Sequence, residues 1–205
     1  MFNKTIEEFT RLTASKDPVP GGGGVSGLTG ALAASLAEMV TSLTTGKKKY
    51  AEYEEEIQAI MQEADALRAS LLNSINEDAE AFAPLAKAYS MDKDAEGYAA
   101  RLESCLREAA NSPFRILKLC TRVIELDERL AVIGSKLAVS DAATSVMLAH
   151  GALYGAMINI RVNTRLMKDK EYAERLDNEA EDLLRKYARR ALKCYKNIEK
   201  RLSDG

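Results

Sequence analysis

Apolar residues recur along most of this chain at three- and four-residue spacings, and no stretch shows sustained alternation of apolar and polar positions. This spacing is typical of amphipathic helices, because a strand requires a period of two. The pattern predicts helices over residues 6–15, 25–44, 50–89, 94–110, 113–130, 135–167 and 170–203. We therefore expect an all-α protein, a helical bundle with long helices that forms one domain over residues 1–205.

Local signals indicate where several of these helices begin, bend or end. Thr5 is expected to cap the first helix, and Glu8, three residues later, to complete a capping box. The run PVPGGGG at residues 18–24 interrupts the pattern before the second helix. Prolines are expected to bend the third helix near Pro84 and to separate the fourth helix from the fifth at Pro113.

Composition and charge narrow the functions that such a bundle can have. Lys and Arg together number 29 against 31 Asp and Glu, so no basic excess is present to bind nucleic acid by bulk electrostatics. The single histidine, His150, excludes most zinc hydrolases and disfavours a Ser-His-Asp triad. We expect His150 to be a satisfied core residue rather than a ligand, which leaves acid–base chemistry to carboxylates, lysines and tyrosines.

Cysteine usage and hydropathy indicate the environment of the chain. The three cysteines, Cys105, Cys120 and Cys194, are odd in number and widely spaced, which fits a reducing cytoplasm and predicts neither a disulfide framework nor a cysteine zinc site. The first residues lack a secretory pattern. Residues 142–160 contain no Asp, Glu, Lys or Arg, but they are rich in Ala and Gly and predict a buried helix. We expect no membrane segment.

Asp78 is the strongest candidate for acid–base chemistry. Four apolar residues share its helix face, at offsets of −7, −3, +4 and +7: Leu71, Ile75, Phe82 and Leu85. A carboxylate on an apolar face is costly unless it is paired, hydrogen-bonded or protonated, so its pKa is expected to be raised. A raised pKa suits a general acid or base near neutral pH. The alternative is a structural aspartate that caps a neighbouring helix or pairs with a buried Lys or Arg.

Four consecutive glycines, Gly21, Gly22, Gly23 and Gly24, precede the second predicted helix. Such a run is entropically costly, so the backbone there must need unusual dihedral angles or a close approach. Amides at a helix N-terminus can also face an anion or ligand, although no nucleotide-binding motif is complete here. Small residues at helical spacing follow, which favour either close packing, within the chain or across a dimer, or ligand contact: Gly27, Gly30, Ala34 and Ala37.

A basic cluster and a pair of amides each allow a structural and a functional interpretation. Lys47, Lys48 and Lys49 form either a solvated turn or a clamp for an anionic substrate tail. Asn159 and Asn163 lie one helical turn apart, so they either contact a polar heterocycle together or are polar residues satisfied within a helical core.

Ser140 and Asp141 lie in an uncharged stretch of small residues, where Ser140 could serve simply as a helix N-cap. In an unbroken helix Asp141 and Asn159 face the same way but are about 27 Å apart at 1.5 Å per residue. One small reactive centre in one subunit cannot use both. Either the helix kinks, a long ligand contacts both, or two subunits contribute.

Three successive segments carry a resemblance over almost the whole chain: PVPGGGGVSGLTGALAASLAEMVTSLTTGKKKY, EDAEAF and VSDAATSVMLAHGALYGAMINIRVN. They resemble the cyclodeaminase/cyclohydrolase family, which includes formiminotetrahydrofolate cyclodeaminases and methenyltetrahydrofolate cyclohydrolases. The similarity is strongest over residues 18–50 and 135–163. One departure is Gly24, where many members carry a serine, so a contact from that hydroxyl is absent.

The resemblance implies an all-helical fold, assembly at least as a homodimer, a tetrahydrofolate derivative as substrate, and no metal or redox cofactor. It implies catalytic roles for Asp78 and Asp141. It also implies a set of substrate-binding residues, in which the lysines would receive the anionic, polyglutamated tail: Gly21, Gly22, Gly23, Gly24, Lys47, Lys48, Lys49, Ser140, Asn159 and Asn163.

Three functions follow as hypotheses. The first is a methenyltetrahydrofolate cyclohydrolase, which opens the 5,10-methenyl bridge to 10-formyltetrahydrofolate. The second is a formiminotetrahydrofolate cyclodeaminase, which releases ammonia. The absence of a formiminotransferase domain favours the first, although a separate protein could supply that step. The third, a non-catalytic helical dimerisation scaffold, is disfavoured because a scaffold gains nothing from aspartates on apolar faces.

Overall fold

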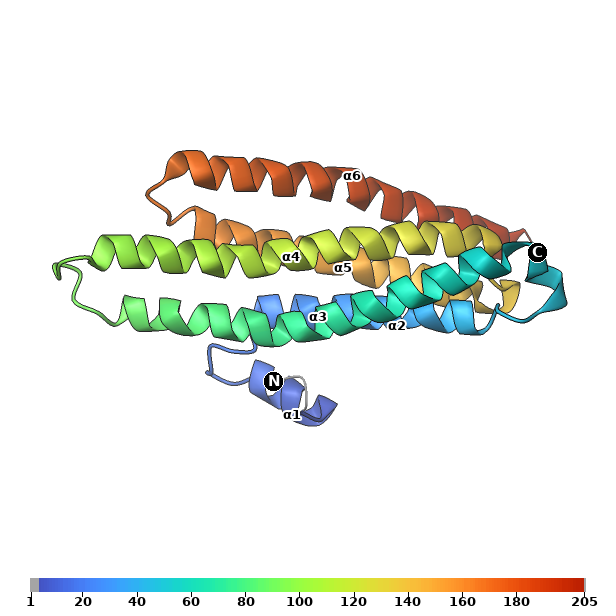
Figure 1. The fold of residues 1–205 in the computed structure, drawn as a ribbon, viewed down its shortest axis with the longest axis horizontal. Helices are drawn as coiled ribbons and strands as arrows, with labels where there is room; N and C mark the ends of the chain where they lie inside the picture. Colours follow the sequence, from blue (N-terminus) through green and yellow to red (C-terminus); the bar gives the residue numbers. More distant parts are fainter. Residues whose placement is uncertain (1–3, 205) are drawn as a thin grey trace.

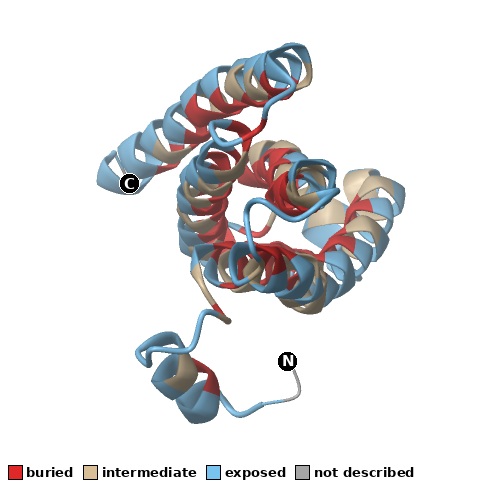
Figure 2. Cartoon of the chain, turned by 90° about the vertical axis from the view of Figure 1, so that its left-hand side faces the viewer, coloured by how far each residue is buried: buried red, intermediate tan, exposed pale blue. Residues whose placement is uncertain are grey.

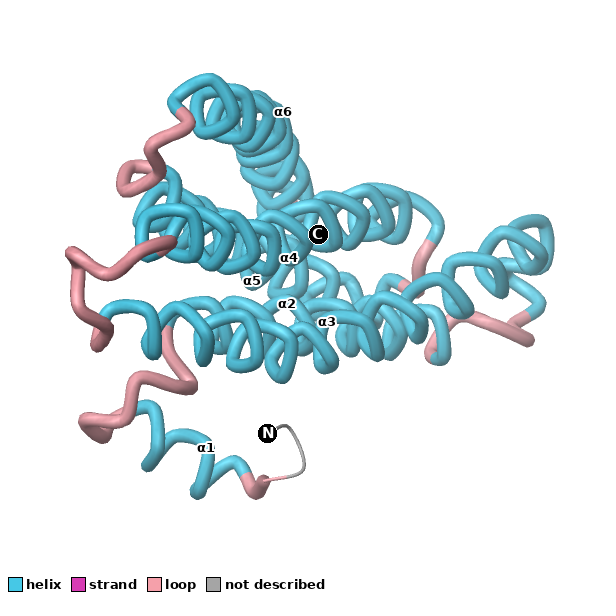
Figure 3. The backbone as a smooth tube through the Cα atoms, turned by 60° about the vertical axis from the view of Figure 1, so that its left-hand side comes forward, coloured by secondary structure: helices cyan, strands magenta, loops and turns pink. Residues whose placement is uncertain are grey.

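The computed structural model describes residues 4–204 as a bundle of long helices with one short helix beside it (Figure 1). The helices are α1 (Ile6–Thr13), α2 (Gly22–Ser42), α3 (Glu54–Tyr89), α4 (Tyr98–Ile133), α5 (Val139–Thr164) and α6 (Lys170–Ser203), with two short 3₁₀ helices, η1 (Lys48–Tyr53) and η2 (Lys136–Ala138). The described part of the chain contains no strand (Figure 3), which confirms the predicted all-α class. None of its helices is both long and apolar enough to span a bilayer.

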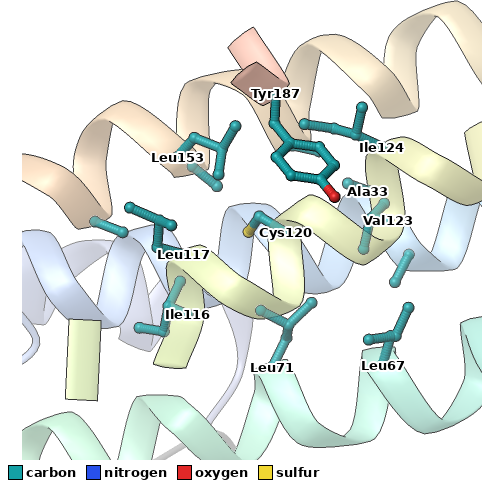
Figure 4. Packing of buried hydrophobic residues seen from close by; sticks show 14 of the residues in the cluster. Ala33, Leu67, Leu71, Ile116, Leu117, Cys120, Val123, Ile124, Leu153 and Tyr187 are labelled. Atoms are coloured by element: carbon teal, nitrogen blue, oxygen red, sulfur yellow. The ribbon is translucent and has the colours of Figure 1, made fainter. Parts of the chain in front are cut away.

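Helices α2, α3, α4 and α5 surround a shared core, and α6 packs along α4 and α5 (Figures 1 and 3). The end-on view shows buried residues on the inward sides of these helices, whereas α1 stands away from the bundle (Figure 2). In the core, side chains from five helices meet (Figure 4): Ala33 of α2, Leu71 of α3, Ile124 of α4, Leu153 of α5 and Tyr187 of α6. One continuous core therefore holds all the long helices together.

The small residues of α2 pack against neighbouring helices of the same chain. A Cβ atom on Gly27 would lie 2.7 Å from Ser74 Oγ on α3, and one on Gly30 would lie 2.9 Å from Cys120 Sγ on α4. Larger side chains would push these helices apart. Close packing within one chain is therefore the role of this face, rather than packing across a dimer.

The helix boundaries confirm some local predictions and correct others. Thr5 and Glu8 form the predicted capping box at the start of α1. The expected break at Pro113 is wrong, because α4 runs unbroken from Tyr98 to Ile133 with the proline inside it. Buried residues on both sides of Pro113 hold the helix in place, which outweighs the loss of one backbone hydrogen bond. Helix α3 continues through Pro84, in agreement with the single helix predicted over residues 50–89.

Two further boundaries differ from the prediction near the candidate residues. Helix α2 begins at Gly22, so most of the glycine run is the first turn of the helix rather than a loop before it. Ser140 lies inside the first turn of α5 and is not its N-cap, which is Ala138. Helix α5 is unbroken from Asp141 to Asn159. The separation of about 27 Å that was expected for an unbroken helix therefore applies to these two residues within one chain.

Helices α2 and α5 run antiparallel along their whole length. At one end Gly22 lies beside Asn159, and at the other the Ser135 amide, just before η2, donates to Thr44 Oγ1 at 2.8 Å. The start of α2 and the end of α5 therefore form one end of the bundle. The basic cluster 47–49 and the start of α5 belong to the opposite end.

A second aspartate, Asp127 of α4, is fully buried in the core. Its Oδ2 lies 2.8 Å from Ser145 Oγ, which also lies 2.7 Å from the Ala33 carbonyl oxygen. A hydroxyl has one hydrogen and a carbonyl only accepts, so when Ser145 donates to Ala33 the second bond requires a proton on Asp127. Its Oδ1 is buried without a hydrogen-bond partner among the described residues. Burial also raises the pKa of this carboxyl well above its usual range.

We expect Asp127→Asn to weaken the pH dependence of stability. The folded protein keeps a proton that the unfolded chain releases above the ordinary aspartate pKa. The free energy of unfolding should therefore fall as pH rises toward the raised folded value, by about 1.4 kcal/mol per pH unit. Two other titratable groups face the carboxyl, Glu128 and the Cys194 thiol, and both remain in the variant.

Urea unfolding at several pH values between 5 and 8 measures this slope. In Asp127→Asn the free energy of unfolding should fall less steeply with pH than in the wild type. The exposed control Asp182→Asn should keep the wild-type slope. An Asp127→Asn variant with the wild-type slope would contradict a protonated Asp127.

Candidate active site

Residues far apart in the sequence line one cavity of about 190 Å³ at the end of the bundle where α2 begins and α5 ends. The loop before α2 and the first turn of α2 form one side, and α3, α4 and α5 form the others. The lining residues are Pro18, Val19, Gly21, Gly22, Gly23, Asp78, Phe82, Ala109, Pro113, Asn159, Val162 and Asn163. Six of them were predicted as site residues: Gly21, Gly22, Gly23, Asp78, Asn159 and Asn163.

Asp78 lies against the N-terminus of α2. That helix has no side-chain cap and no acidic residue in its first turn, so its amides need an acceptor from elsewhere. The Gly24 amide hydrogen-bonds the Asp78 carboxylate, and Ser112 Oγ of α4 donates to its Oδ1 at 3.5 Å. Asp78 thus caps a neighbouring helix, as the structural alternative proposed. Because the same side chain also lines the cavity, capping and catalysis are compatible.

The close approach of Asp78 to Gly23 is one reason why glycine is needed in the run 21–24. A Cβ atom at this position would lie 2.2 Å from Asp78 Oδ1 and 2.5 Å from both Cγ and Oδ2. The carboxylate therefore occupies the space that a side chain would fill. Gly22 has a similar role, since its Cβ would lie 2.8 Å from Asn159 Nδ2. The glycines allow a carboxylate and an amide to approach the helix start closely.

Burial raises the pKa of Asp78, and the Gly24 amide and the Ser112 hydroxyl partly oppose this by stabilising the charged form. The predicted direction is confirmed. Three of the four apolar neighbours predicted from the sequence, Leu71, Ile75 and Leu85, are buried. The carboxyl is therefore held between an apolar helix face and a helix N-terminus, where it can exchange a proton with a bound ligand.

Two asparagines form the α5 side of the cavity. Asn159 Nδ2 donates to the Gly155 carbonyl at 2.7 Å. Asn163 Nδ2 donates to the Asn159 carbonyl at 2.9 Å and to the Ala109 carbonyl of α4 at 3.2 Å. Both amides are thus fixed by the backbone while they line the cavity, so they can offer their remaining groups to a polar ring.

The remaining predicted residues do not reach this cavity within one chain. Lys47, Lys48 and Lys49 are exposed at the opposite end of α2. Ser140 and Asp141 are in the first turn of α5, also at that end. Asp141 therefore cannot act on the same small centre as Asp78 of its own chain.

Ser140 lines a different groove between α5 and α6, of about 590 Å³. Met147, Leu148, Ile198 and Leu202 make most of that groove apolar. Groups for acid–base chemistry are sparse there, with one carboxylate, from Glu199, among its lining residues. The smaller cavity is the better candidate for a reactive centre because it combines a carboxyl of raised pKa with fixed amides.

His150 lies outside the cavity, and the expectation of a satisfied core histidine is wrong. The ring is half-buried, burial lowers its pKa, and it packs against the Tyr154 ring in a tilted arrangement with centroids 5.0 Å apart. Its Nε2 is buried without a hydrogen-bond partner among residues 4–204.

Sequence analysis missed Ser112 and Pro113 as members of the site. Both lie on α4, where the pair had been interpreted as a break between helices. A proline in the middle of an otherwise continuous helical pattern is the signal that could have identified them. Such a proline is costly and therefore calls for a reason in the tertiary structure.

Known proteins resemble this chain in sequence and in architecture. A sequence profile of the family described as formiminotransferase-cyclodeaminase matches residues 5–182. A Methylorubrum extorquens protein named methenyltetrahydrofolate cyclohydrolase is 34% identical, and the match covers 98% of this chain and 99% of that one. Mouse formimidoyltransferase-cyclodeaminase is 24% identical, and the chain spans 38% of its length.

The fold has a solved counterpart. The crystal structure of formiminotetrahydrofolate cyclodeaminase from Thermotoga maritima superposes with a TM-score of 0.84 at 29% identity, covering 98% of this chain and 97% of that one. Sequence and structure thus match over nearly the full length. The chain belongs to the formiminotransferase-cyclodeaminase family.

Proposed function

We propose that this protein is a methenyltetrahydrofolate cyclohydrolase. The observation that carries the proposal is the end-to-end match to a protein of that name, which covers 98% of this chain and 99% of the relative. The cavity supplies a carboxyl with a raised pKa beside two fixed amides, which is suitable for hydrolysis by proton transfer.

In the proposed reaction water adds to the carbon of the cationic methenyl bridge, and the Asp78 carboxylate accepts a proton from it. Asp78 then returns this proton to N5 as the C–N5 bond breaks. The hydroxyl proton of the adduct leaves to solvent, and a formyl group remains on N10. An ionised Asp78 also stabilises the positive charge of the bridge before attack.

A second candidate activity is formiminotetrahydrofolate cyclodeamination, which the match to the Thermotoga maritima cyclodeaminase favours. There N10 attacks the formimino carbon on N5, and Asp78 would protonate the departing ammonia. Both reactions pass through a tetrahedral carbon between two nitrogens. The same carboxyl could therefore serve either one.

Absorbance of methenyltetrahydrofolate in the near ultraviolet distinguishes these activities. Loss of the absorbance on adding the protein identifies the cyclohydrolase. Its appearance from formiminotetrahydrofolate identifies the cyclodeaminase. No change with either compound would contradict both proposals and support a scaffold without catalysis.

We further propose a homodimer formed through the outer faces of α2 and α5. Helix α2 exposes Val25, Leu32 and Met39, and α5 exposes Tyr154, Ile158 and Val162. Leu43 and Leu166, just past the ends of these helices, are exposed too. Because α2 and α5 lie side by side, these residues form one apolar surface. A row of exposed large apolar side chains along two neighbouring helices is typical of a surface that binds a partner, and a two-fold axis would let each copy cover the other.

A two-fold axis across the middle of these antiparallel helices would bring the far end of each copy to the cavity of the other. The partner's Ser140–Asp141 and Lys47–Lys49 segments would then approach Asp78. The size of the cavity supports this arrangement, since about 190 Å³ is below the roughly 300–1,000 Å³ of typical ligand sites. We propose that two chains complete each site and that the partner's lysines bind the polyglutamated tail of the substrate. We also propose that the protein acts in the cytoplasm.

Mixing Asp78→Asn with Asp141→Asn protein should restore activity to two impaired variants. After unfolding and refolding together, half the dimers are mixed, and each has one intact site. The expected recovery is about a quarter of wild-type turnover. Light scattering should show dimers throughout, whereas a wild-type monomer at micromolar concentration, or no recovery on mixing, would contradict a shared site.

Replacing all three lysines 47–49 by glutamine should raise KM for polyglutamated folates and leave kcat nearly unchanged. Exposed charges contribute to binding a distant anionic tail rather than to the reacting carbon, and salt screens them over about 10 Å at 0.1 M. Steady-state kinetics at low and high salt measure the effect. An equal loss with monoglutamate and polyglutamate substrates would refute the tail-binding role.

A further inference from the structure

A proline inside α4 leaves one backbone carbonyl without its helical partner at the cavity wall. Pro113 has no N–H, so the hydrogen bond that residue 113 would normally donate to the Ala109 carbonyl cannot form. Both residues are buried and both line the cavity. A buried carbonyl requires another donor.

Asn163 of α5 supplies that donor. Its Nδ2 lies 3.2 Å from the Ala109 carbonyl oxygen and 2.9 Å from the carbonyl oxygen of Asn159. A side-chain amide has two N–H hydrogens, and these two acceptors use both. The hydrogen-bonding capacity left to Asn163 is the acceptor Oδ1.

We propose that Pro113 is a positioning residue that fixes Asn163 as an acceptor in the candidate active site. By freeing the Ala109 carbonyl, the proline gives the amide a second anchor and prevents it from turning over. Asn163 then selects a ligand edge that presents an N–H donor. This inference rests on the proposed function and deepens it. It pairs the acceptor Oδ1 of Asn163 with an N–H donor of the substrate's pterin ring.

The chain contains a matched control for this idea. Pro84 also lies inside a long helix, α3, but its side chain is exposed. Neither Pro84 nor Glu80, whose carbonyl it frees, lines the cavity. Replacing either proline by alanine restores one helical hydrogen bond. Only in Pro113→Ala does the new backbone N–H compete with Asn163 Nδ2 for the Ala109 carbonyl.

The test is a double-mutant cycle with Pro113→Ala and Asn163→Ala, beside Pro84→Ala. Both single changes at the site should raise KM for methenyltetrahydrofolate roughly five- to tenfold, the effect of one hydrogen bond. The double variant should have the KM of Asn163→Ala alone, because Pro113 acts only through Asn163. Both Pro113→Ala and Pro84→Ala should raise the melting temperature, but Pro84→Ala should leave KM unchanged.

Melting temperatures provide a second measurement that needs no substrate. Asn163→Ala should lower the melting temperature more in the wild-type background than in the Pro113→Ala background, where the restored backbone N–H at position 113 satisfies the Ala109 carbonyl. Additive melting temperatures, or an unchanged KM in Pro113→Ala, would overturn the proposal for Pro113. A wild-type protein that leaves methenyltetrahydrofolate unchanged would overturn the assignment of the ligand edge and the proposed function together, whereas the melting temperatures would still decide the link between Pro113 and Asn163.

Discussion

Replacing Asp78 by asparagine should lower turnover by about 10²–10⁴, the usual contribution of a positioned general acid or base. Asparagine keeps the size of the side chain and can still accept from the Gly24 amide and Ser112. It cannot take up or return a proton. Because burial already disfavours the charged carboxylate, the melting temperature should hold or rise.

Glu80→Gln is the matched control for Asp78→Asn. Glu80 lies two residues further along α3, is exposed and does not line the cavity, so its variant should retain wild-type turnover. Steady-state kinetics and thermal unfolding of both variants decide the question. Full turnover in Asp78→Asn would remove Asp78 from the mechanism, and an unfolded variant would show that its role is structural.

Replacing Gly23 by alanine should reduce turnover by about 10² with little loss of fold. The added Cβ would occupy the position of the Asp78 carboxylate, at 2.2–2.5 Å from three of its atoms. The short aspartate side chain must then move aside, and a displacement of about 1 Å at a reactive group costs roughly 10² in rate. Helix α2 itself should tolerate alanine, which favours helices over glycine.

Gly24→Ala is the comparison for Gly23→Ala. The closest contact of a Cβ at position 24 would be Pro20 Cβ at 3.3 Å, not the carboxylate. Its effect on turnover should be less than tenfold. Equal losses in the two variants would show that glycine flexibility matters here, rather than the space that Asp78 occupies.

Much of the fold could be predicted from the sequence because helical periodicity and capping are local. The capping box of Thr5 and Glu8 and the apolar stripe around Asp78 depend only on residues within two turns. Pro113 was misjudged for the same reason. Local rules assign it to a helix start, whereas buried contacts on both sides, made by residues far away in the chain, keep α4 continuous.

The candidate site could be predicted only in part. The resemblance named Asp78, Asn159 and Asn163 as site residues, and the structure places all three around one cavity. It also named Asp141 and the lysines 47–49, which lie at the opposite end of the bundle. The sequence contained the reason to separate them, since an unbroken helix places Asp141 about 27 Å from Asn159. Whether the helix is interrupted between the two residues was a question for the tertiary structure, in which α5 is continuous from Val139 to Thr164.

Asp78 and Asp127 show most clearly what the sequence can predict and what requires the tertiary structure. Each lies on an apolar helix face, Asp127 with Ile124 and Leu130 at offsets of −3 and +3, and burial raises the pKa of both carboxyls. Sequence analysis singled out Asp78 and missed Asp127. Periodicity tells which side of a helix turns inward. Which residues contact that side depends on how helices from distant parts of the sequence pack against it. Asp78 meets a glycine-rich helix start and an open cavity, and Asp127 meets Ser145 in a closed core.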